Sequence, residues 1–189
     1  QSKVMKNLRL TSGKFIVSTL HRPANVDKKE NLKKILRIFQ SVPGDLTTVL
    51  SMHPRTKKNI RLAGLWAAFN KITNLKIINP QNYFDQLALV KNSFCVFTDS
   101  GGIQEEAAFL GVPTLTARIT TERPATIRVG ANQLVSLEAE KILPLIEVLR
   151  SFDRKSIGSL PHSDGRASKR IVDILCSALS ERSICLDCW

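Results

Sequence analysis

The chain has 189 residues, 43% of them hydrophobic, and a formal net charge of +12 at pH 7, which predicts one domain with a full hydrophobic core. No segment approaches the roughly 20 consecutive apolar residues of a membrane span, and residues 1–10 lack the apolar part of a signal peptide. We therefore expect a cytoplasmic protein without a membrane partner, and because the first residue is Gln rather than Met, we expect it to start inside a longer protein.

Strand and helix patterns alternate from the start of the chain. The first predicted strand spans residues 15–20, and a polar loop follows over 21–27. Residues 30–42 carry apolar side chains close to helical spacing, and Pro43-Gly44 ends this helix. A second apolar strand is predicted over 48–52.

The same alternation continues to the end of the chain. A second helix opens at residues 53–55, and a strand over 75–78 precedes a loop at 79–81. The remaining predicted elements are helices over 83–91, 102–111, 139–152 and 167–179, and strands over 94–97, 113–116 and 133–136. Residues 181–189 show no periodicity, so we expect an irregular tail beyond a domain that covers residues 1–180.

Repeated strand–helix units of this length predict an α/β fold, a Rossmann-like parallel sheet with helices on both faces. The strands are apolar throughout, as expected when both faces are covered. Ligands of such sheets bind beyond the carboxyl ends of the strands. Because His21, His53, residues 79–81 and Ser100 each follow a predicted strand, we expect a binding site where they meet.

The positive charge predicts a solvated surface, or a face that meets an acidic partner domain. The residues concerned are Lys28, Lys29, Lys33, Lys34, Arg37, Arg55, Lys57, Lys58 and Arg61. Aromatic residues are not interleaved with them, which argues against nucleic acid as a partner. Cys95 and Cys176 are expected to be buried free thiols, and Cys185 with Cys188 lacks the second pair that a zinc site requires, so no metal is expected.

The junction Ser100-Gly101-Gly102 stands where a strand ends and a helix begins. The helix N-terminus presents free backbone N–H groups and partial positive charge, which favour an anion such as a phosphate. An ordinary Ser-capped helix is the alternative. Glu106 lies one turn further on, where a carboxylate can accept hydrogen bonds from the vicinal hydroxyls of a ribose, or can simply be a surface residue.

Other polar residues at the predicted sheet edge also suit a phosphorylated ligand. His21 beside Arg22 suits proton transfer or diphosphate binding, and His53 repeats the pattern at the next strand end. Arg123 can clamp a phosphate. The alternatives are a histidine bonded to backbone, and a salt bridge from Arg123 to Glu122 or a neighbour.

Five motifs in this order resemble the non-hydrolysing UDP-N-acetylglucosamine 2-epimerases, over about residues 15–175. They are Thr-Leu-His-Arg-Pro-Ala-Asn-Val-Asp at 19–27, His-Pro-Arg-Thr at 53–56, Thr-Asp-Ser-Gly-Gly-Ile-Gln-Glu-Glu at 98–106, Thr-Thr-Glu-Arg-Pro at 120–124, and Asp164-Gly165 with Ala167. The resemblance implies the C-terminal, UDP-binding domain of a glycosyltransferase-B-type fold, whose N-terminal domain has no counterpart in this chain.

The resemblance also implies roles for individual residues. It places Ser100, Gly101 and Gly102 on the diphosphate and Glu106 on the ribose. Gln81 and Gln86 are placed against the uridine, and Arg123 completes the nucleotide site. His21 is placed at the reacting region, and Arg22 and His53 at a second, activating UDP-N-acetylglucosamine. The family's chemistry is elimination of UDP to a 2-acetamidoglucal and its re-addition, which inverts C2 without a metal or redox cofactor. The resemblance also implies a homodimer in the full-length form.

Several positions depart from the family's pattern. Ala24 and Ala125 stand where Glu is usual, Gln86 replaces a Phe, and His162-Ser163 replaces a Tyr-Gly. The carboxylates expected to move the C2 proton belong to the N-terminal domain. We therefore expect the UDP-binding half of an epimerase, which is inactive alone. The alternatives are a non-catalytic UDP-sugar-binding or degenerate homologue, and a related hydrolysing epimerase or glycosyltransferase.

Overall fold

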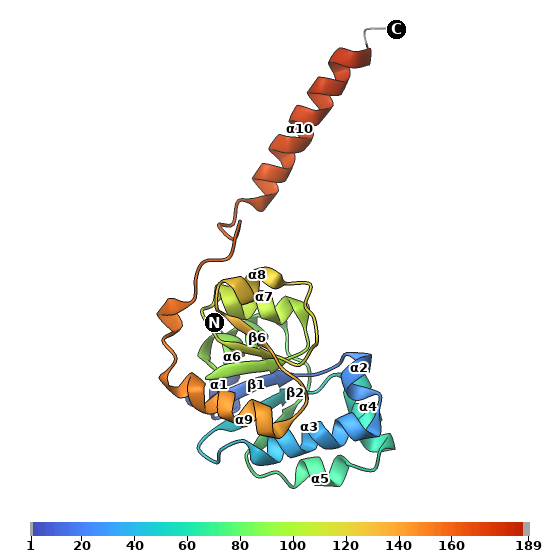
Figure 1. The fold of residues 1–189 in the computed structure, drawn as a ribbon, viewed down its shortest axis with the longest axis vertical. Coiled ribbons are helices and arrows are strands. Elements are labelled where there is room, and N and C mark those ends of the chain that lie inside the picture. Colours follow the sequence, from blue (N-terminus) through green and yellow to red (C-terminus); the bar gives the residue numbers. More distant parts are fainter. Residues whose placement is uncertain (1, 187–189) are drawn as a thin grey trace.

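A computed structural model describes residues 2–186, and the side chains of residues 2–180. Its centre is one six-stranded parallel sheet (Figure 1). The strands are β1 (Phe15–Thr19), β2 (Thr47–Ser51), β3 (Leu75–Ile78), β4 (Cys95–Thr98), β5 (Thr114–Thr116) and β6 (Asn132–Leu134). All six predicted strands are therefore confirmed, with bounds that differ by at most two residues.

The helices follow the predicted alternation. They are α1 (Val4–Asn7), α2 (Pro23–Val26), α3 (Lys29–Ser41), α4 (Pro54–Leu62), α5 (Trp66–Asn70), α6 (Tyr83–Asn92), α7 (Gly101–Phe109), α8 (Pro124–Arg128), α9 (Ala139–Val148) and α10 (Ala167–Leu186), with 3-10 turns η1 (Leu149–Ser151) and η2 (Arg154–Ser156). The short helices α1, α2, α5 and α8 are absent from the sequence prediction, because a single turn shows no periodicity.

The strand order is β3-β2-β1-β4-β5-β6. The chain builds outward from β1 to β3, then returns to the other side of β1 with β4. Parallel pairing sets Ile16 opposite Cys95 and Thr19 opposite Thr98. The direction of winding thus reverses between β1 and β4, and in such sheets ligands bind in the crevice at this reversal.

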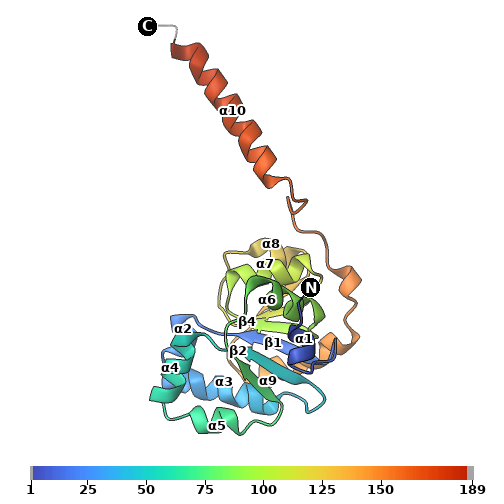
Figure 2. The same ribbon diagram turned by 180° about the vertical axis from the view of Figure 1, so that it is seen from behind.

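Helices cover both faces of the sheet, which confirms the Rossmann-like fold class (Figures 1 and 2). Successive residues of β1 point to opposite faces. Ile16 packs in a cluster with Phe39 of α3 and Ile142 of α9, while Val17 packs in a second cluster with Leu89 of α6. Because helices cover both faces of the central strands, β1 and β4 are buried at consecutive positions.

The C-terminal helix α10 projects away from the body of the molecule in both views (Figures 1 and 2). It continues to Leu186, so the expectation of an irregular tail from residue 181 is wrong as far as Leu186; the segment contains no Gly or Pro to end the helix. Residues 187–189, and so part of the Cys185–Cys188 pair, lie outside the described residues.

The two described cysteines differ in their surroundings. Cys95 is buried in β4, and burial raises the pKa of its thiol to about 12. Cys176 is exposed on α10, so the expectation that it is buried is wrong. The amphipathic pattern predicts a helix with an apolar face, but it does not indicate which part of a protein covers that face. No described helix is long and apolar enough to cross a membrane.

Candidate functional site

The carboxyl ends of the parallel strands carry the polar segments that the sequence predicts there. His21 follows β1, His53 follows β2, the loop 79–81 follows β3, and Ser100 follows β4. Because the strands are parallel, these segments lie along one edge of the sheet. His21 and Ser100 flank the reversal between β1 and β4, where a ligand crevice is expected.

The start of α7 leaves its polar groups available to a ligand. Ser100 is the N-cap residue; its N–H donates to Thr98 Oγ1 at 3.0 Å, but its hydroxyl makes no capping bond in the described chain. The alternative of a helix capped by the Ser100 side chain is therefore wrong. Gly102 is exposed, so an anion can approach the first-turn N–H groups of α7.

A buried carboxylate joins the two loops at the reversal point. The Asp99 side chain is fully buried, and it accepts the backbone N–H groups of His21 at 3.0 Å and Arg22 at 2.9 Å. It also accepts Asn25 Nδ2 at 2.9 Å, and its Oδ1 lies 3.0 Å from His21 Nδ1. Asp99 therefore fixes both the loop after β1 and the ring of His21.

His21 and His53 are neighbours at the sheet edge. Their ring centroids are 5.1 Å apart, and the His53 Nδ1 accepts the N–H of Arg55 at 3.1 Å. Burial, then the nearby His21 and Arg55, lowers the pKa of His53, and Asp99 opposes this shift. His21 contacts Asp99, whereas the lowered pKa of His53 keeps His53 neutral. His21 is therefore the better placed of the two for proton transfer.

A buried glutamine, whose role the sequence does not reveal, connects α7 to the Thr-Glu-Arg loop. Gln104 Oε1 accepts Thr121 Oγ1 at 2.6 Å and Asn132 Nδ2 at 3.1 Å, while its Nε2 donates to the Ser100 carbonyl at 3.2 Å. Thr121 Oγ1 in turn accepts the Arg123 N–H at 3.0 Å. Gln104 therefore holds Ser100 and Arg123 in fixed relation to each other.

Arginines surround the start of α7. Glu122 pairs with Arg22 at 2.9 Å and with Arg118. Arg123 forms an ion pair with Glu105 rather than Glu122, with its Nε 3.3 Å from that carboxylate but without a hydrogen bond among the described residues, which confirms the alternative of a salt bridge to a neighbour. The structure thus brings three guanidinium groups to the crevice, of which the sequence singles out Arg22 and Arg123 but not Arg118.

Glu106 lies on α7 beside both a charged residue and an apolar surface. It is half-buried, and burial, with a smaller effect of Glu105, raises the pKa of its carboxyl. It lines a cavity of about 490 Å³ whose apolar wall includes Tyr83 and Phe109. A carboxylate beside an apolar surface suits a ligand that combines hydroxyl groups with a flat ring.

The two glutamines of the predicted uridine site lie just before α6 and within it. Gln81 donates from Nε2 to the Asn79 carbonyl at 2.7 Å. Gln86 lies within α6, and its buried Nε2 has no described hydrogen-bond partner. The described contacts do not join either side chain to the cluster around Ser100.

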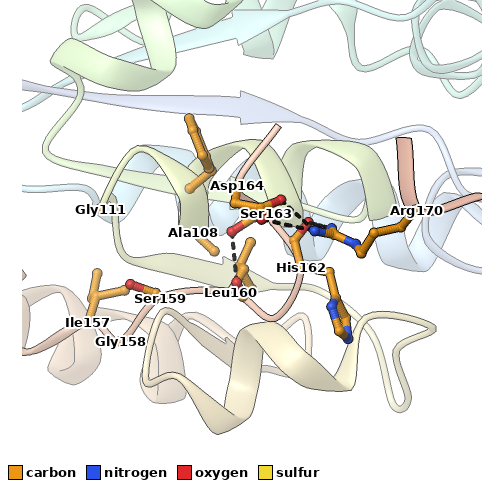
Figure 3. A pocket seen from close by; sticks show the side chains of 11 residues that line it. Ala108, Gly111, Ile157, Gly158, Ser159, Leu160, His162, Ser163, Asp164 and Arg170 are labelled. Atoms are coloured by element: carbon orange, nitrogen blue, oxygen red, sulfur yellow. Dashed lines mark hydrogen bonds and ion pairs between the residues drawn. The ribbon is translucent and has the colours of Figure 1, made fainter. Parts of the chain in front are cut away.

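A second cavity, of about 510 Å³, lies between the C-terminal end of α7 and the segment 157–164 (Figure 3). Arg170 donates to both carboxylate oxygens of Asp164 at 2.9 Å and to the His162 carbonyl at 3.0 Å. The charge of Arg170 is therefore already paired with Asp164. The C-terminal end of α7 also lies away from the edge formed by the carboxyl ends of the strands. We therefore assign the ligand to the crevice. Among the described residues, no cluster of three or more His, Cys, Asp or Glu is placed to hold a metal.

The sequence model of the UDP-N-acetylglucosamine 2-epimerase family matches residues 1–176. The UDP-N-acetylglucosamine 2-epimerase of Methanocaldococcus jannaschii is 42% identical over 163 residues, 85% of this chain and 44% of that protein. Its counterpart in Methanococcus maripaludis is 37% identical over 179 residues, 92% of this chain and 46% of that protein.

Solved structures agree with these sequence comparisons. The Methanocaldococcus jannaschii UDP-GlcNAc 2-epimerase in complex with UDP-GlcNAc and UDP superposes with a TM-score of 0.83 at 37% identity, over 94% of this chain and 49% of that one. The chain thus spans about half the length of the relatives that it matches. Because the family model matches residues 1–176, most of the chain, the chain belongs to the UDP-N-acetylglucosamine 2-epimerase family.

Proposed function

We propose that this chain is the UDP-binding part of a UDP-N-acetylglucosamine 2-epimerase, which interconverts UDP-N-acetylglucosamine and UDP-N-acetylmannosamine. The observation that carries the proposal is the start of α7, which lies at the reversal between β1 and β4 and whose Ser100 hydroxyl makes no capping bond among the described residues. A solved relative with 37% identity holds UDP-GlcNAc and UDP.

The nucleotide is assigned along α7. The diphosphate lies on the first turn, with Ser100, Gly101, Gly102 and Arg123 around it. Glu106, one turn further on, accepts the ribose hydroxyls, which its half-buried position favours. The uridine is assigned beyond the ribose, toward Gln81 and Gln86. Gln86 Nε2 is buried and has no partner among the described residues, so the side chain would have to turn outward to donate to a uracil carbonyl.

His21 is assigned to the leaving-group side of the reaction. In the elimination the proton on C2 is removed, the bond between C1 and the UDP oxygen breaks, and the glycal and UDP form. His21 Nδ1 lies 3.0 Å from Asp99 Oδ1 in an ion-pair contact, and the other ring nitrogen, Nε2, is assigned to interact with the departing phosphate. The re-addition reverses these steps on the other face of C2. No step requires a metal or a redox cofactor.

The base at C2 is assigned to the other half of the complete protein, because the departures Ala24 and Ala125 leave no extra carboxylate in the two loops that carry them. The isolated chain is therefore expected to bind UDP without turning over UDP-N-acetylglucosamine. We further propose that the complete protein is a cytoplasmic homodimer, and that Arg22 and His53, which adjoin His21, contact an activating second UDP-N-acetylglucosamine.

A non-catalytic UDP-sugar-binding protein is the second candidate, and the same two alanines favour it. The two candidates make the same prediction for UDP binding by this chain but opposite predictions for the complete protein. Release of UDP-N-acetylmannosamine by the complete protein would exclude the non-catalytic candidate. Release of free N-acetylmannosamine, or transfer of the sugar to an acceptor, would instead indicate a hydrolysing epimerase or a glycosyltransferase.

Isothermal titration calorimetry tests the binding site itself. The chain is expected to release heat with UDP. Ser100→Ala combined with Glu106→Ala is expected to weaken binding by at least about 100-fold, since each lost hydrogen bond to a charged group costs about 1.5–3 kcal/mol and two are lost. Ser177→Ala with Glu147→Ala, two exposed positions away from the crevice, is the matched control and should bind like the wild type. Absence of heat at millimolar UDP would contradict the proposal.

A further inference from the structure

The carboxylate of Glu122 occupies the position of an anion at the start of α7. A Cβ built on Gly101 would lie 2.5 Å from Glu122 Oε1, so the carboxylate rests directly against the first residue of the helix. The same oxygen accepts Arg22 at 2.9 Å, and the other oxygen accepts Arg118. A helix N-terminus and two guanidinium groups are the partners that a phosphate would take.

The contact is also one that can open. The side chains of Glu122 and Arg22 are each 41% exposed, whereas that of Arg118 is only 20% exposed. Hydrogen bonds from its own backbone N–H and from Arg118 lower the pKa of Glu122, so it is ionised at neutral pH. An exposed carboxylate therefore neutralises the less exposed Arg118, which has no other ion pair among the described residues.

A cavity borders Arg22 and Arg118, the two guanidinium groups that pair with Glu122, and a ligand would reach them through it. Arg22 and Arg118 line a cavity of about 600 Å³ at the carboxyl edge of the sheet, and Ala117 and Val135 belong to its apolar wall. The two guanidinium groups thus stand between a cavity and the start of α7. An anion that enters here meets Arg118 and must compete with Glu122 for it.

We propose that Glu122 is an internal competitor of the ligand diphosphate, and that Arg118 is a ligand-binding residue. In the free chain Glu122 holds Arg22 and Arg118 at the start of α7. A diphosphate displaces this carboxylate, which moves into solvent, and takes over both guanidinium groups and the first-turn N–H groups. The inference rests on the proposed function, since it assigns two further residues to the UDP site.

Calorimetry with two probes, UDP and inorganic pyrophosphate, tests this inference on the whole chain. Glu122→Gln keeps the size of the side chain but removes its charge, and it is expected to bind both probes about 3- to 10-fold more tightly. Glu147→Gln, which removes the same charge from α9, is the matched control and should not change either affinity. Arg118→Gln is expected to weaken both probes about 10-fold or more.

The double variant Arg118→Gln with Glu122→Gln separates competition from a general charge effect. If Glu122 acts through Arg118, the gain from Glu122→Gln shrinks when Arg118 is already absent. Thermal unfolding should show that each variant folds like the wild type.

The outcomes distinguish this inference from the proposed function. Wild-type UDP binding that Glu122→Gln leaves unchanged or weakens overturns the inference and leaves the proposed function standing. Tighter pyrophosphate binding by Glu122→Gln without UDP binding by any variant supports the competing carboxylate and overturns the nucleotide assignment. No binding of either probe to the wild type or Glu122→Gln overturns both.

Discussion

Replacing Asp99 by Ala is expected to lower the free energy of unfolding by roughly 3–5 kcal/mol, a large part of a small domain's stability. The side chain is fully buried and is the shared acceptor of the His21 and Arg22 N–H groups and of Asn25 Nδ2. Its removal leaves the partly buried N–H groups of His21 and Arg22 without this acceptor, each at a cost of about 1–3 kcal/mol unless water enters, while Asn25 Nδ2 keeps its bond to the Ala117 carbonyl. Urea unfolding followed by circular dichroism measures the change.

Asp45→Ala is the matched control, because Asp45 is an exposed aspartate that pairs with Arg150 on the far side of the sheet. An exposed ion pair contributes little, so this variant should unfold at nearly the wild-type urea concentration. A wild-type midpoint for Asp99→Ala would show that the loops after β1 and β4 are held by other contacts, and the assignment of Asp99 as the residue that positions His21 would fail with it.

His21→Asn in the complete protein is expected to lower kcat for epimerisation by roughly 100- to 10,000-fold, the usual contribution of a positioned acid or base. Asn can still donate a hydrogen bond but cannot gain or lose a proton near neutral pH. UDP binding by the same variant should stay within about threefold of the wild type, because the main nucleotide contacts are assigned to α7. The measurement is the rate of UDP-N-acetylmannosamine formation.

Two further readouts make this prediction specific to His21. Asp99→Asn, if it folds, should lower kcat while retaining UDP binding, because it disturbs the His21 ring rather than the cradle at Ser100. A kcat for His21→Asn that equals the wild-type value would assign proton transfer on the leaving-group side to another residue, and would contradict the catalytic part of the proposed function.

Much of the framework of the site could be predicted from the sequence. The central strands β1 and β4 are apolar at consecutive positions because helices cover both faces. The alternation of short strand patterns with helical patterns located all six strands. The glycines after Ser100 marked the start of α7, and His53 was correctly expected at the start of α4. These features depend on residues that are close together in the chain, so local patterns are sufficient to find them.

The contacts that connect the loops were not predictable in the same way. Asp99 was visible only as part of a motif, and its role depends on the loop after β1 lying against the loop after β4. Gln104 looked like an ordinary helix residue, yet it is buried and bonds to Thr121 and Asn132. Each partner lies far along the chain or on another element, so no short-range pattern identifies it.

The sequence by itself therefore determined the parallel α/β fold and the position of the helix start at Ser100, which it predicted as an anion site at the carboxyl edge of the sheet, because hydrophobic periodicity and glycine positions encode these features locally. Only the tertiary structure decided which charges meet there. It placed Glu122 against Gly101, paired Arg118 with that carboxylate, and left α10 exposed. The physical reason is that ion pairs and burial depend on which surfaces the fold brings together. The identity of a charged residue does not indicate which oppositely charged residue it will contact.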